Sequence, residues 1–360
     1  MINFLLDNSL LILSYLFFTV LLSFFLTQKI FNFSIKKNIC DDPKSAISRK
    51  MQKHPIPLLG GTGACLAGLI AISVFWLFLK FGYLNPYFSN NLSIFKLYYL
   101  IIAGLMMLFV GYLDDRYQLS AKWQFLSILT VIAITIFLGQ IRIDNITYFG
   151  QIDYYISVFV TFAWLGFAIA STKFLDGHDG LVTSVGIVNF LTIANVAVMD
   201  KINQPIIFVF ALILSCSFTV FLFYNFPNAV SYLGEGGSEF IGFMVGVLAI
   251  LSGAKLATAL SVLGWFIIDI FIVWFIRIRE GRNPITSADR NHWHHRLLKF
   301  GLNKIQVLVV TWFLLIVSSY VGVYGDTNQK ISLIISQIVI LVGIYNFTPK
   351  QKEKQQKLAP

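Results

Sequence analysis

Long apolar runs alternate with short polar islands along the whole chain. Runs of about 18 or more apolar residues recur, and that length is enough to cross a hydrocarbon core of about 30 Å. The first run is too long for a signal-peptide core and follows no basic segment, so we expect it to be retained as a span. The pattern predicts eleven transmembrane helices, at residues 9–30, 58–80, 95–113, 122–140, 156–172, 180–199, 205–224, 239–254, 256–276, 305–324 and 331–346.

Composition excludes a water-soluble fold. Of the 360 residues, 57% are hydrophobic and only 12% are charged, whereas a soluble domain carries roughly 25% charged residues. We therefore predict an all-α integral membrane protein with a single polytopic domain over residues 1–348 and a Lys- and Gln-rich cytoplasmic tail over 349–360. Alternating apolar and polar residues at 141–155 predict one small external β-hairpin.

The distribution of positive charge predicts the orientation in the membrane. If the N-terminus lies outside, 21 of the 27 Lys and Arg residues fall on one side of the eleven spans and six on the other. Cytoplasmic loops carry the excess of Lys and Arg, so the richer side and the C-terminus are predicted to be cytoplasmic. The net charge of +10 is thus mainly a topology signal, with a secondary attraction to anionic lipid or nucleotide, and does not indicate nucleic-acid binding.

Polar islands with chemical potential all fall on this predicted cytoplasmic side. Ionisable residues at the membrane are costly and usually functional. They end the third span, end the fifth, precede the eighth and occupy the last large loop: Asp114, Asp115, Asp176, Asp179, Glu235, His292, His294 and His295. Together they suit a site for a charged, water-soluble substrate.

Basic residues and glycines in two islands suggest phosphate binding. Arg49, Lys50 and His54 precede the Gly60–Gly61 pair, and Arg or Lys binds phosphate by charge and hydrogen bonds; a loop that only sets orientation is the alternative. Residues 234–238, Gly-Glu-Gly-Gly-Ser, open a span, where backbone N–H groups can hold phosphate; the alternative is that Ser238 is an N-cap.

Paired carboxylates and histidines mark the other islands. Asp114 and Asp115 repel each other, so a divalent cation, a nearby cation or a raised pKa must compensate them, unless they simply end a hydrated helix. Two Asp-Gly steps at 176–180 predict a tight turn between spans, which is also consistent with a plain connection. Residues 289–296 favour hydrogen bonding to phosphate or ribose over zinc, because no cysteine accompanies the histidines. Asp269, inside a span, is expected to pair with an Arg.

Taken in order, these islands resemble the polyprenyl-phosphate N-acetylhexosamine-1-phosphate transferases, a superfamily that includes MraY, WecA and TagO. The match covers residues 42–301. It includes the Arg-Lys…His…Pro…Gly-Gly loop, Gly-x-x-Asp-Asp, Asp-Gly-x-Asp-Gly-Leu, Gly-acid-x-Gly-Ser and His-x-His-His. The last motif is similar to the WecA/TagO branch, since MraY carries three consecutive histidines there.

The resemblance implies transfer of an N-acetylhexosamine 1-phosphate, with GlcNAc 1-phosphate favoured, from a UDP-sugar to undecaprenyl or another polyprenyl phosphate. It implies a multi-pass protein of the bacterial cytoplasmic membrane, and leaves a homodimer open. Asp114, Asp115 and Asp176 would be catalytic, with the Asp pair at the lipid phosphate, and Glu235 would bind Mg²⁺. The substrate-binding residues would be Asp179, Lys173, Arg49, His54, Gly236, Ser238, Arg290, His292, His294, His295 and Arg296.

Two positions depart from the family pattern. Lys173 stands where an Asn usually helps to hold the metal, and Glu235 stands where Asp is usual. We expect Lys173 to pair with Glu235 and to supply part of the charge of Mg²⁺, which puts strict Mg²⁺ dependence in question. The alternatives are a lipid I synthase, which transfers phospho-MurNAc-pentapeptide, and a non-enzymatic polyprenyl-sugar transporter or binding homologue.

Overall fold

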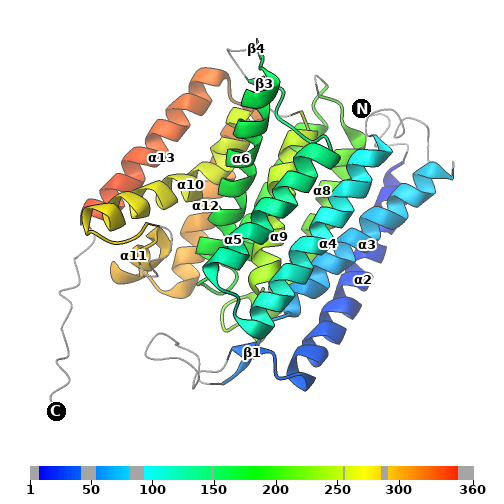
Figure 1. Cartoon of the computed structure of the whole chain (residues 1–360), viewed down its shortest axis with the longest axis horizontal. Coiled ribbons are helices and arrows are strands. Elements are labelled where there is room, and N and C mark those ends of the chain that lie inside the picture. Colours follow the sequence, from blue (N-terminus) through cyan, green and yellow to red (C-terminus); the bar gives the residue numbers. More distant parts are fainter. Residues whose placement is uncertain are drawn as a thin grey trace.

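The computed structural model describes residues 8–41, 54–81, 93–146, 150–200, 202–253, 256–284 and 291–347. Over these ranges the chain forms twelve α-helices, a short π-helix and two tiny antiparallel sheets (Figure 1). The helices are α2 (Ser9–Lys36), α3 (Gly60–Lys80), α4 (Ile94–Tyr117), α5 (Ala121–Ala133), α6 (Tyr154–Leu175), α7 (Leu181–Ala197), α8 (Pro205–Asn225), α9 (Glu235–Leu251), α10 (Leu256–Arg279), α11 (Trp293–Lys299), α12 (Lys304–Tyr324) and α13 (Thr327–Phe347).

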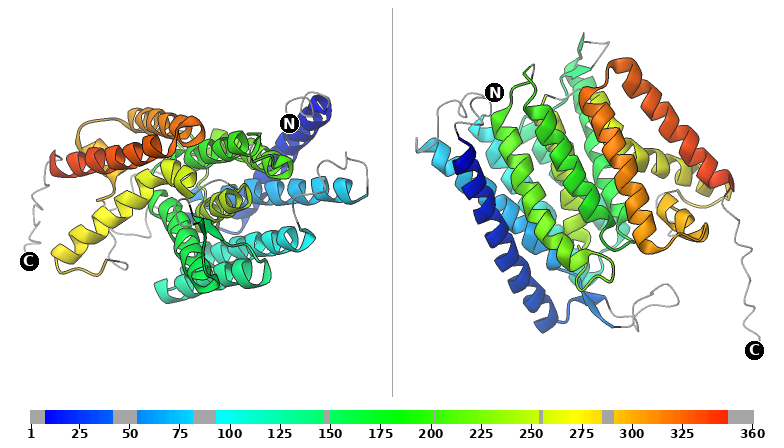
Figure 2. Two further views of the ribbon diagram at one scale, coloured as in Figure 1. Left: turned by 90° about the horizontal axis from the view of Figure 1, so that it is seen from above. Right: turned by 180° about the vertical axis from the view of Figure 1, so that it is seen from behind.

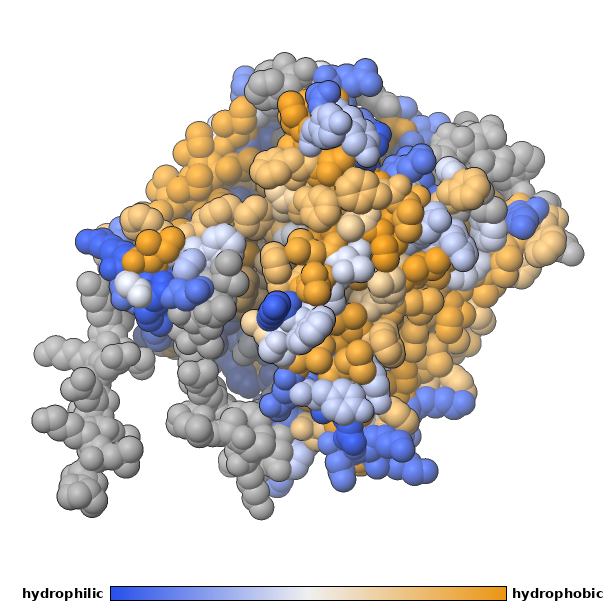
Figure 3. Space-filling model, in the orientation of Figure 1, coloured by the Kyte–Doolittle hydropathy of each residue, from blue (hydrophilic) through white to orange (hydrophobic). Residues whose placement is uncertain are grey.

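The protein is an all-α integral membrane protein. Each of the eleven predicted spans corresponds to one long helix, and α5 is extended by the π-helix Ile134–Leu138. In the described ranges nine helices are long and apolar enough to cross a membrane. Apolar side chains cover the middle of the surface, and polar side chains gather towards its two ends (Figure 3). This is the surface that a lipid bilayer solvates.

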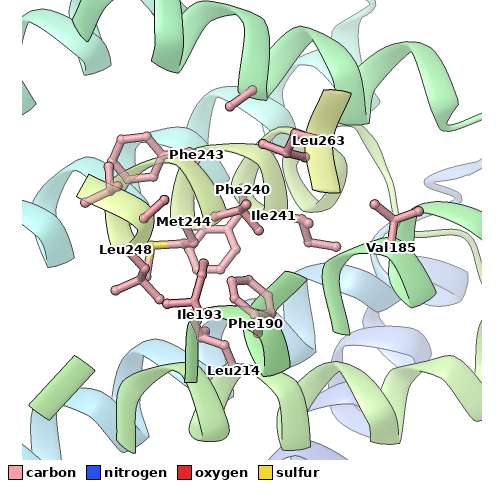
Figure 4. Close-up of a cluster of buried hydrophobic side chains, with 14 of the residues drawn as sticks. Val185, Phe190, Ile193, Leu214, Phe240, Ile241, Phe243, Met244, Leu248 and Leu263 are labelled. Carbon is pink, nitrogen blue, oxygen red and sulfur yellow. The ribbon is translucent and has the colours of Figure 1, made fainter. Parts of the chain in front are cut away.

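Helices α7 and α9, of 17 residues each, lie inside the bundle. Every residue of α9 from 236 to 249 is buried, and α9 contacts α3, α4, α6, α7, α8 and α10 (Figure 2). Large apolar side chains of α9 pack against those of α7, α8 and α10 in one buried cluster (Figure 4). Because protein surrounds α9, its carboxylates need partners inside the protein rather than in lipid.

The helices alternate in direction, which brings the polar islands to one end. Helices α4, α6 and α8 end where α5, α7 and α9 begin, at the end of the bundle that carries the strand pair β1 (Cys40–Asp41) and β2 (Ile56–Pro57) (Figure 1). The predicted hairpin is present at the opposite end, where β3 (Asn145–Ile146) pairs with β4 (Gly150–Gln151).

The structure refines several predicted boundaries near this end, each by no more than four residues. Helix α9 begins at Glu235 with Gly234 as its N-cap residue, so Ser238 lies within the helix and is not the N-cap. Helix α4 continues to Tyr117 and therefore carries both aspartates. The loop predicted at 277–304 contains the seven-residue α11, which is too short to show a helical period.

Candidate active site

The two adjacent carboxylates at the end of α4 have different partners. Both Asp114 oxygens accept hydrogen bonds from the Gln124 amide at 2.9 Å, and one also accepts the Leu119 backbone N–H at 2.7 Å. Asp114 therefore closes the turn between α4 and α5. Asp115 instead reaches α9, where its Oδ1 accepts the Glu235 backbone N–H at 3.2 Å. Its buried Oδ2 has no hydrogen-bond partner among the described residues and is the oxygen available to a ligand.

Glycines allow α4 and α9 to approach closely enough for this contact. A Cβ placed on Gly111, one turn before Asp115, would lie 2.0 Å from the Cα of Gly236. Gly234 has a φ of +77°, a conformation that costs glycine little. A Cβ there would lie 2.6 Å from Asp115 Oδ2 and 2.5 Å from the Leu58 carbonyl oxygen. The glycines of these two motifs thus bring the α4 carboxylate to the first turn of α9.

Lys173 binds two carboxylates of α9. Its Nζ lies 2.8 Å from Glu235 Oε2 and 2.7 Å from Glu239 Oε1. The expected pair with Glu235 is confirmed, whereas Glu239 was not singled out from the sequence. The Glu239 side chain is only 3% exposed, and a buried carboxylate requires a paired charge. The i, i+4 spacing of the two glutamates on one helix face was the signal that could have identified it.

Asp176 joins this cluster from the end of α6. Burial of its carboxyl, and then the Glu235 carboxylate, raise the pKa of Asp176 to about 8, against a hydrogen bond from Ser238 and the charge of Lys173. The residue as a whole still keeps an exposed surface. The raised pKa favours the protonated form of this carboxyl until a ligand or cation changes its surroundings.

Asp179, on the same turn, pairs with a different helix. Its Oδ2 lies 2.8 Å from Nζ of Lys304, the first residue of α12. The Tyr232 side chain is close by, and its burial together with Asp179, Asp41 and Asp176 raises the pKa of its hydroxyl. Sequence reasoning missed both Lys304 and Tyr232, because neither belongs to one of the recognised motifs.

Four of the five histidines gather beside this turn. The His294 ring centroid lies 4.2 Å from that of His295, 6.2 Å from His292 and 6.4 Å from His178. His294 is fully buried, and burial followed by its imidazole neighbours lowers its pKa well below the usual value. Neither of its ring nitrogens has a hydrogen-bond partner in the part of the chain that the structure describes. The cluster is therefore neutral at its centre at neutral pH.

The expectation that Asp269 pairs with an Arg was wrong. Its Oδ2 lies 2.6 Å from His292 Nδ1, while its Oδ1 accepts the Trp293 backbone N–H at 2.9 Å and the Tyr345 hydroxyl at 2.6 Å. The start of α11 folds onto α10, so His292 reaches the carboxylate. Arg296, one turn further on, reaches α13 instead: its guanidinium lies 3.9 Å from the Tyr345 ring centroid and donates to the Tyr345 carbonyl oxygen at 3.2 Å.

The first island contributes packing as well as charge. A Cβ on Gly60 or Gly61 would collide with the Ser231 hydroxyl or the Leu233 carbonyl. Helix packing therefore accounts for the absence of side chains at this pair, and its part in phosphate binding remains a prediction. His54 is exposed beside β2, and Arg49 and Arg290 lie outside the described residues.

Two predicted substrate-binding residues, Gly236 and Ser238, are buried in the first turn of α9, directly after Glu235. Gly236 packs against Gly111, and the Ser238 hydroxyl donates to the Glu235 carbonyl oxygen at 3.1 Å. Both residues have a structural role in holding the first turn of α9. Their contact with a substrate remains a prediction.

Comparison with known proteins shows which family the chain resembles. Residues 97–253, which include the Asp pair, the Asp-Gly turn and the first turn of α9, match the glycosyl transferase family 4 model. This part of the chain is therefore similar to glycosyl transferase family 4. A probable undecaprenyl-phosphate N-acetylglucosaminyl 1-phosphate transferase of Bacillus subtilis (strain 168) is 29% identical over 325 residues, covering 86% of this chain and 83% of the relative.

Two further relatives show the same breadth of similarity. The undecaprenyl-phosphate alpha-N-acetylglucosaminyl 1-phosphate transferase of Escherichia coli (strain K12) is 25% identical over 91% of this chain and 89% of its own length. A decaprenyl-phosphate N-acetylglucosaminephosphotransferase of Mycolicibacterium smegmatis is 25% identical over 69% of this chain and 70% of its own length. The relatives are all named as transferases, so this protein is a transferase, and the comparisons speak against the transporter and binding-protein alternatives.

Proposed function

We propose that this transferase moves an N-acetylhexosamine 1-phosphate, with N-acetylglucosamine 1-phosphate favoured, from a UDP-sugar to undecaprenyl or another polyprenyl phosphate, releasing UMP. The product would begin a lipid-linked cell-surface glycan. The protein would lie in a bacterial cytoplasmic membrane with its site on the cytoplasmic side, where UDP-sugars are made.

One observation carries the proposal: ionisable groups from three helices meet at one end of the membrane bundle. Lys173 of α6 binds Glu235 and Glu239 of α9, Asp115 of α4 accepts the Glu235 backbone N–H, and Asp176 at the end of α6 lies near Glu235 and Lys173. Phosphoryl transfer needs positioning and charge neutralisation more than covalent chemistry. The names of the three relatives describe transfer of N-acetylglucosamine 1-phosphate to undecaprenyl or decaprenyl phosphate.

The reaction assigns a part to each group. An oxygen of the polyprenyl phosphate attacks the phosphorus next to the sugar, the bond from that phosphorus to the bridging oxygen breaks, and UMP leaves with that oxygen. The unpartnered Asp115 Oδ2 would receive the acceptor proton, and Asp114 would hold the turn that places it. Asp176 and Asp179 would face the nucleotide, with Lys304 near its phosphates.

The remaining predicted residues would hold the donor substrate. His292, His294, His295 and Arg296, with Arg290, would face the diphosphate or the sugar. Arg49 and His54 would add positive charge from the first island. Helix α11, with its N-cap residue His292, already carries three of the four clustered imidazoles and Arg296. Movement of this short helix would therefore move these four side chains together.

Mg²⁺ fits this site as a partner of the substrate phosphates. The described residues form no group of three or more His, Cys, Asp or Glu side chains able to hold a metal ion. Mg²⁺, however, is commonly bound by only one or two carboxylates together with phosphates. Glu235 would hold it together with the substrate phosphates, and its charge would neutralise those phosphates. Lys173 competes for Glu235, so we propose that Mg²⁺ dependence is weakened.

A donor panel tests the function. Membranes containing the protein are mixed with undecaprenyl phosphate and, separately, with UDP-GlcNAc, UDP-GalNAc, UDP-glucose and UDP-MurNAc-pentapeptide, and both UMP and the lipid product are measured. We expect UMP release with an N-acetylhexosamine donor, and its loss in Asp115→Asn. As a control, Asp153→Asn keeps a cap residue at the opposite end of α6 and should be fully active. Product from UDP-MurNAc-pentapeptide alone would identify a lipid I synthase, and no UMP from any donor would contradict the proposal.

A further inference from the structure

A buried carboxylate away from the Lys173–Glu235–Glu239 cluster is hydrogen-bonded to the residues that begin α11. Asp269, in α10, is 1% exposed and accepts from three donors on two other segments: His292 Nδ1, the Trp293 backbone N–H and the Tyr345 hydroxyl. Nothing in the transfer reaction requires a carboxylate at this depth. Holding His292 is therefore the function that its contacts indicate.

The hydrogen bonds determine where the His292 ring carries its proton. A carboxylate oxygen at 2.6 Å can only accept, so Nδ1 must donate and carries the proton. The ring is nearly parallel to that of Phe174, with centroids 5.4 Å apart at 19°, and to that of His294, at 6.2 Å and 5°. These two neighbours oppose rotation of the ring. In the neutral ring the other nitrogen, Nε2, therefore points away from Asp269 and offers a lone pair.

We propose that Asp269 is a positioning residue that sets the tautomer of His292, so that Nε2 serves as a hydrogen-bond acceptor for a hydroxyl or amide N–H of the sugar nucleotide. The part concerning the sugar nucleotide rests on the proposed function. The tautomer itself does not, because it follows from the contacts of Asp269. Carboxylates that accept the other ring N–H of a metal-binding histidine commonly fix its tautomer in this way.

An asparagine at position 269 reverses the tautomer while keeping the packing. The Trp293 backbone N–H can only donate, so the amide oxygen of Asn must occupy the Oδ1 position that receives it. The amide NH₂ then faces His292 Nδ1, which must accept, and the ring proton moves to Nε2. Asp269→Asn thus converts Nε2 from an acceptor to a donor with nearly unchanged shape.

Steady-state kinetics test the consequence for the substrate. Because a substrate donor would then face a donor, Asp269→Asn should lower kcat/KM for the UDP-sugar roughly ten- to hundredfold. The KM for undecaprenyl phosphate and the melting temperature in detergent should not change. In a His292→Asn background, which keeps a donor facing Asp269 but removes Nε2, Asp269→Asn should have no further effect. Losses that multiply in the double variant would contradict the proposal, since Asp269 would then act on more than His292.

Nitrogen-15 NMR gives a second readout that needs no activity. The chain has five histidines, so selective labelling produces few signals, and the His292→Asn spectrum assigns the signal of His292. We expect a protonated Nδ1 in the wild type and in Tyr345→Phe, which keeps the Trp293 donor, and a protonated Nε2 in Asp269→Asn. A wild-type proton on Nε2, or no change in Asp269→Asn, would overturn the inference. Absence of UMP release by the wild type would instead remove the proposed function and leave the tautomer result standing.

Discussion

At the scale of single residues, the structure separates two aspartates that are chemically identical in the sequence. Asp114 is occupied by Gln124 and Leu119, whereas Asp115 keeps one buried oxygen without a described partner. We expect both to be needed, but for different reasons. Asp115 would act on the substrate, and Asp114 would hold the turn from which Asp115 is presented.

This division predicts different variants. Asp115→Asn should lower kcat about a hundredfold or more, as loss of a general base typically does, at an unchanged melting temperature. Asp114→Asn should lower both activity and melting temperature, because it weakens the α4–α5 turn. Gln124→Ala, which removes only the hydrogen-bond donor to Asp114, should also lower the melting temperature. Assays of UMP release beside thermal unfolding in detergent measure both quantities, and full activity of Asp115→Asn would exclude the catalytic assignment.

Lys173 places a cation where the family pattern has a neutral Asn. The effect of this cation on the Mg²⁺ requirement can be measured. Because its ammonium is shared by Glu235 and Glu239, Lys173→Asn and Glu235→Asp should each lose more activity than the double variant. The double variant should need more Mg²⁺ for half-maximal activity.

Glu239 supplies the control for the Lys173 prediction. Lys173→Asn leaves this buried carboxylate without its cation and should lower the melting temperature, and adding Glu239→Gln should restore much of it. Independent losses with the same Mg²⁺ requirement in every variant would show that Lys173 and Glu235 are not coupled.

At the scale of elements, α9 connects the core to the site. Its residues 236–249 are buried, and its first turn carries Glu235 and receives Asp115. The site is therefore as rigid as the packing of α9 against α4. Gly111 and Gly236 form a close backbone contact between these helices.

Adding one methyl group at this approach should disrupt the site. The new Cβ of Gly111→Ala would lie 2.0 Å from Gly236, so α4 and α9 must separate, and a displacement of about 1 Å can cost roughly a hundredfold in rate. Gly166→Ala in α6 is the matched control, because its Cβ would meet nothing within 4 Å among the described residues. It should keep full activity and unfold at the same or a higher temperature. Equal behaviour of the two variants would contradict the role of this contact.

At the scale of the whole molecule, one end of the bundle carries the site and the other carries the β3–β4 hairpin (Figure 1). The islands from the end of α4, the end of α6, the start of α9 and the loop before α11 meet at the first end. The orientation of this end towards the cytoplasm remains a prediction from the charge distribution.

Reporter fusions test that orientation. Because 21 of the 27 Lys and Arg residues lie on the predicted inner side, a reporter fused after Pro360 should be active only in the cytoplasm. An accessible tag inserted at Gly150, in the hairpin, should be labelled from outside the cell. The reverse pattern would place the site outside, away from cytoplasmic UDP-sugars, and would contradict the proposed function as well.

Sequence alone determined the properties that depend on local composition and order. Apolar length predicted the eleven helices, and alternation of spans predicted a shared end for the islands. The resemblance to a family with a metal site at positions 173 and 235 predicted the pairing of Lys173 with Glu235. The first two predictions succeed because the bilayer imposes a simple rule on each segment: an apolar run of sufficient length must cross it.

Only the tertiary structure decided which polar groups are partners. Glu239, Lys304 and Tyr345 lie far in sequence from Lys173, Asp179 and Asp269, and no motif joins them, so their pairing depends on how close the helices come. That distance is set by small residues such as Gly111 and Gly236, whose neighbours a sequence does not reveal. Inside a membrane protein buried polar groups must find partners within the fold, and the packing of the helices determines which partners are within reach.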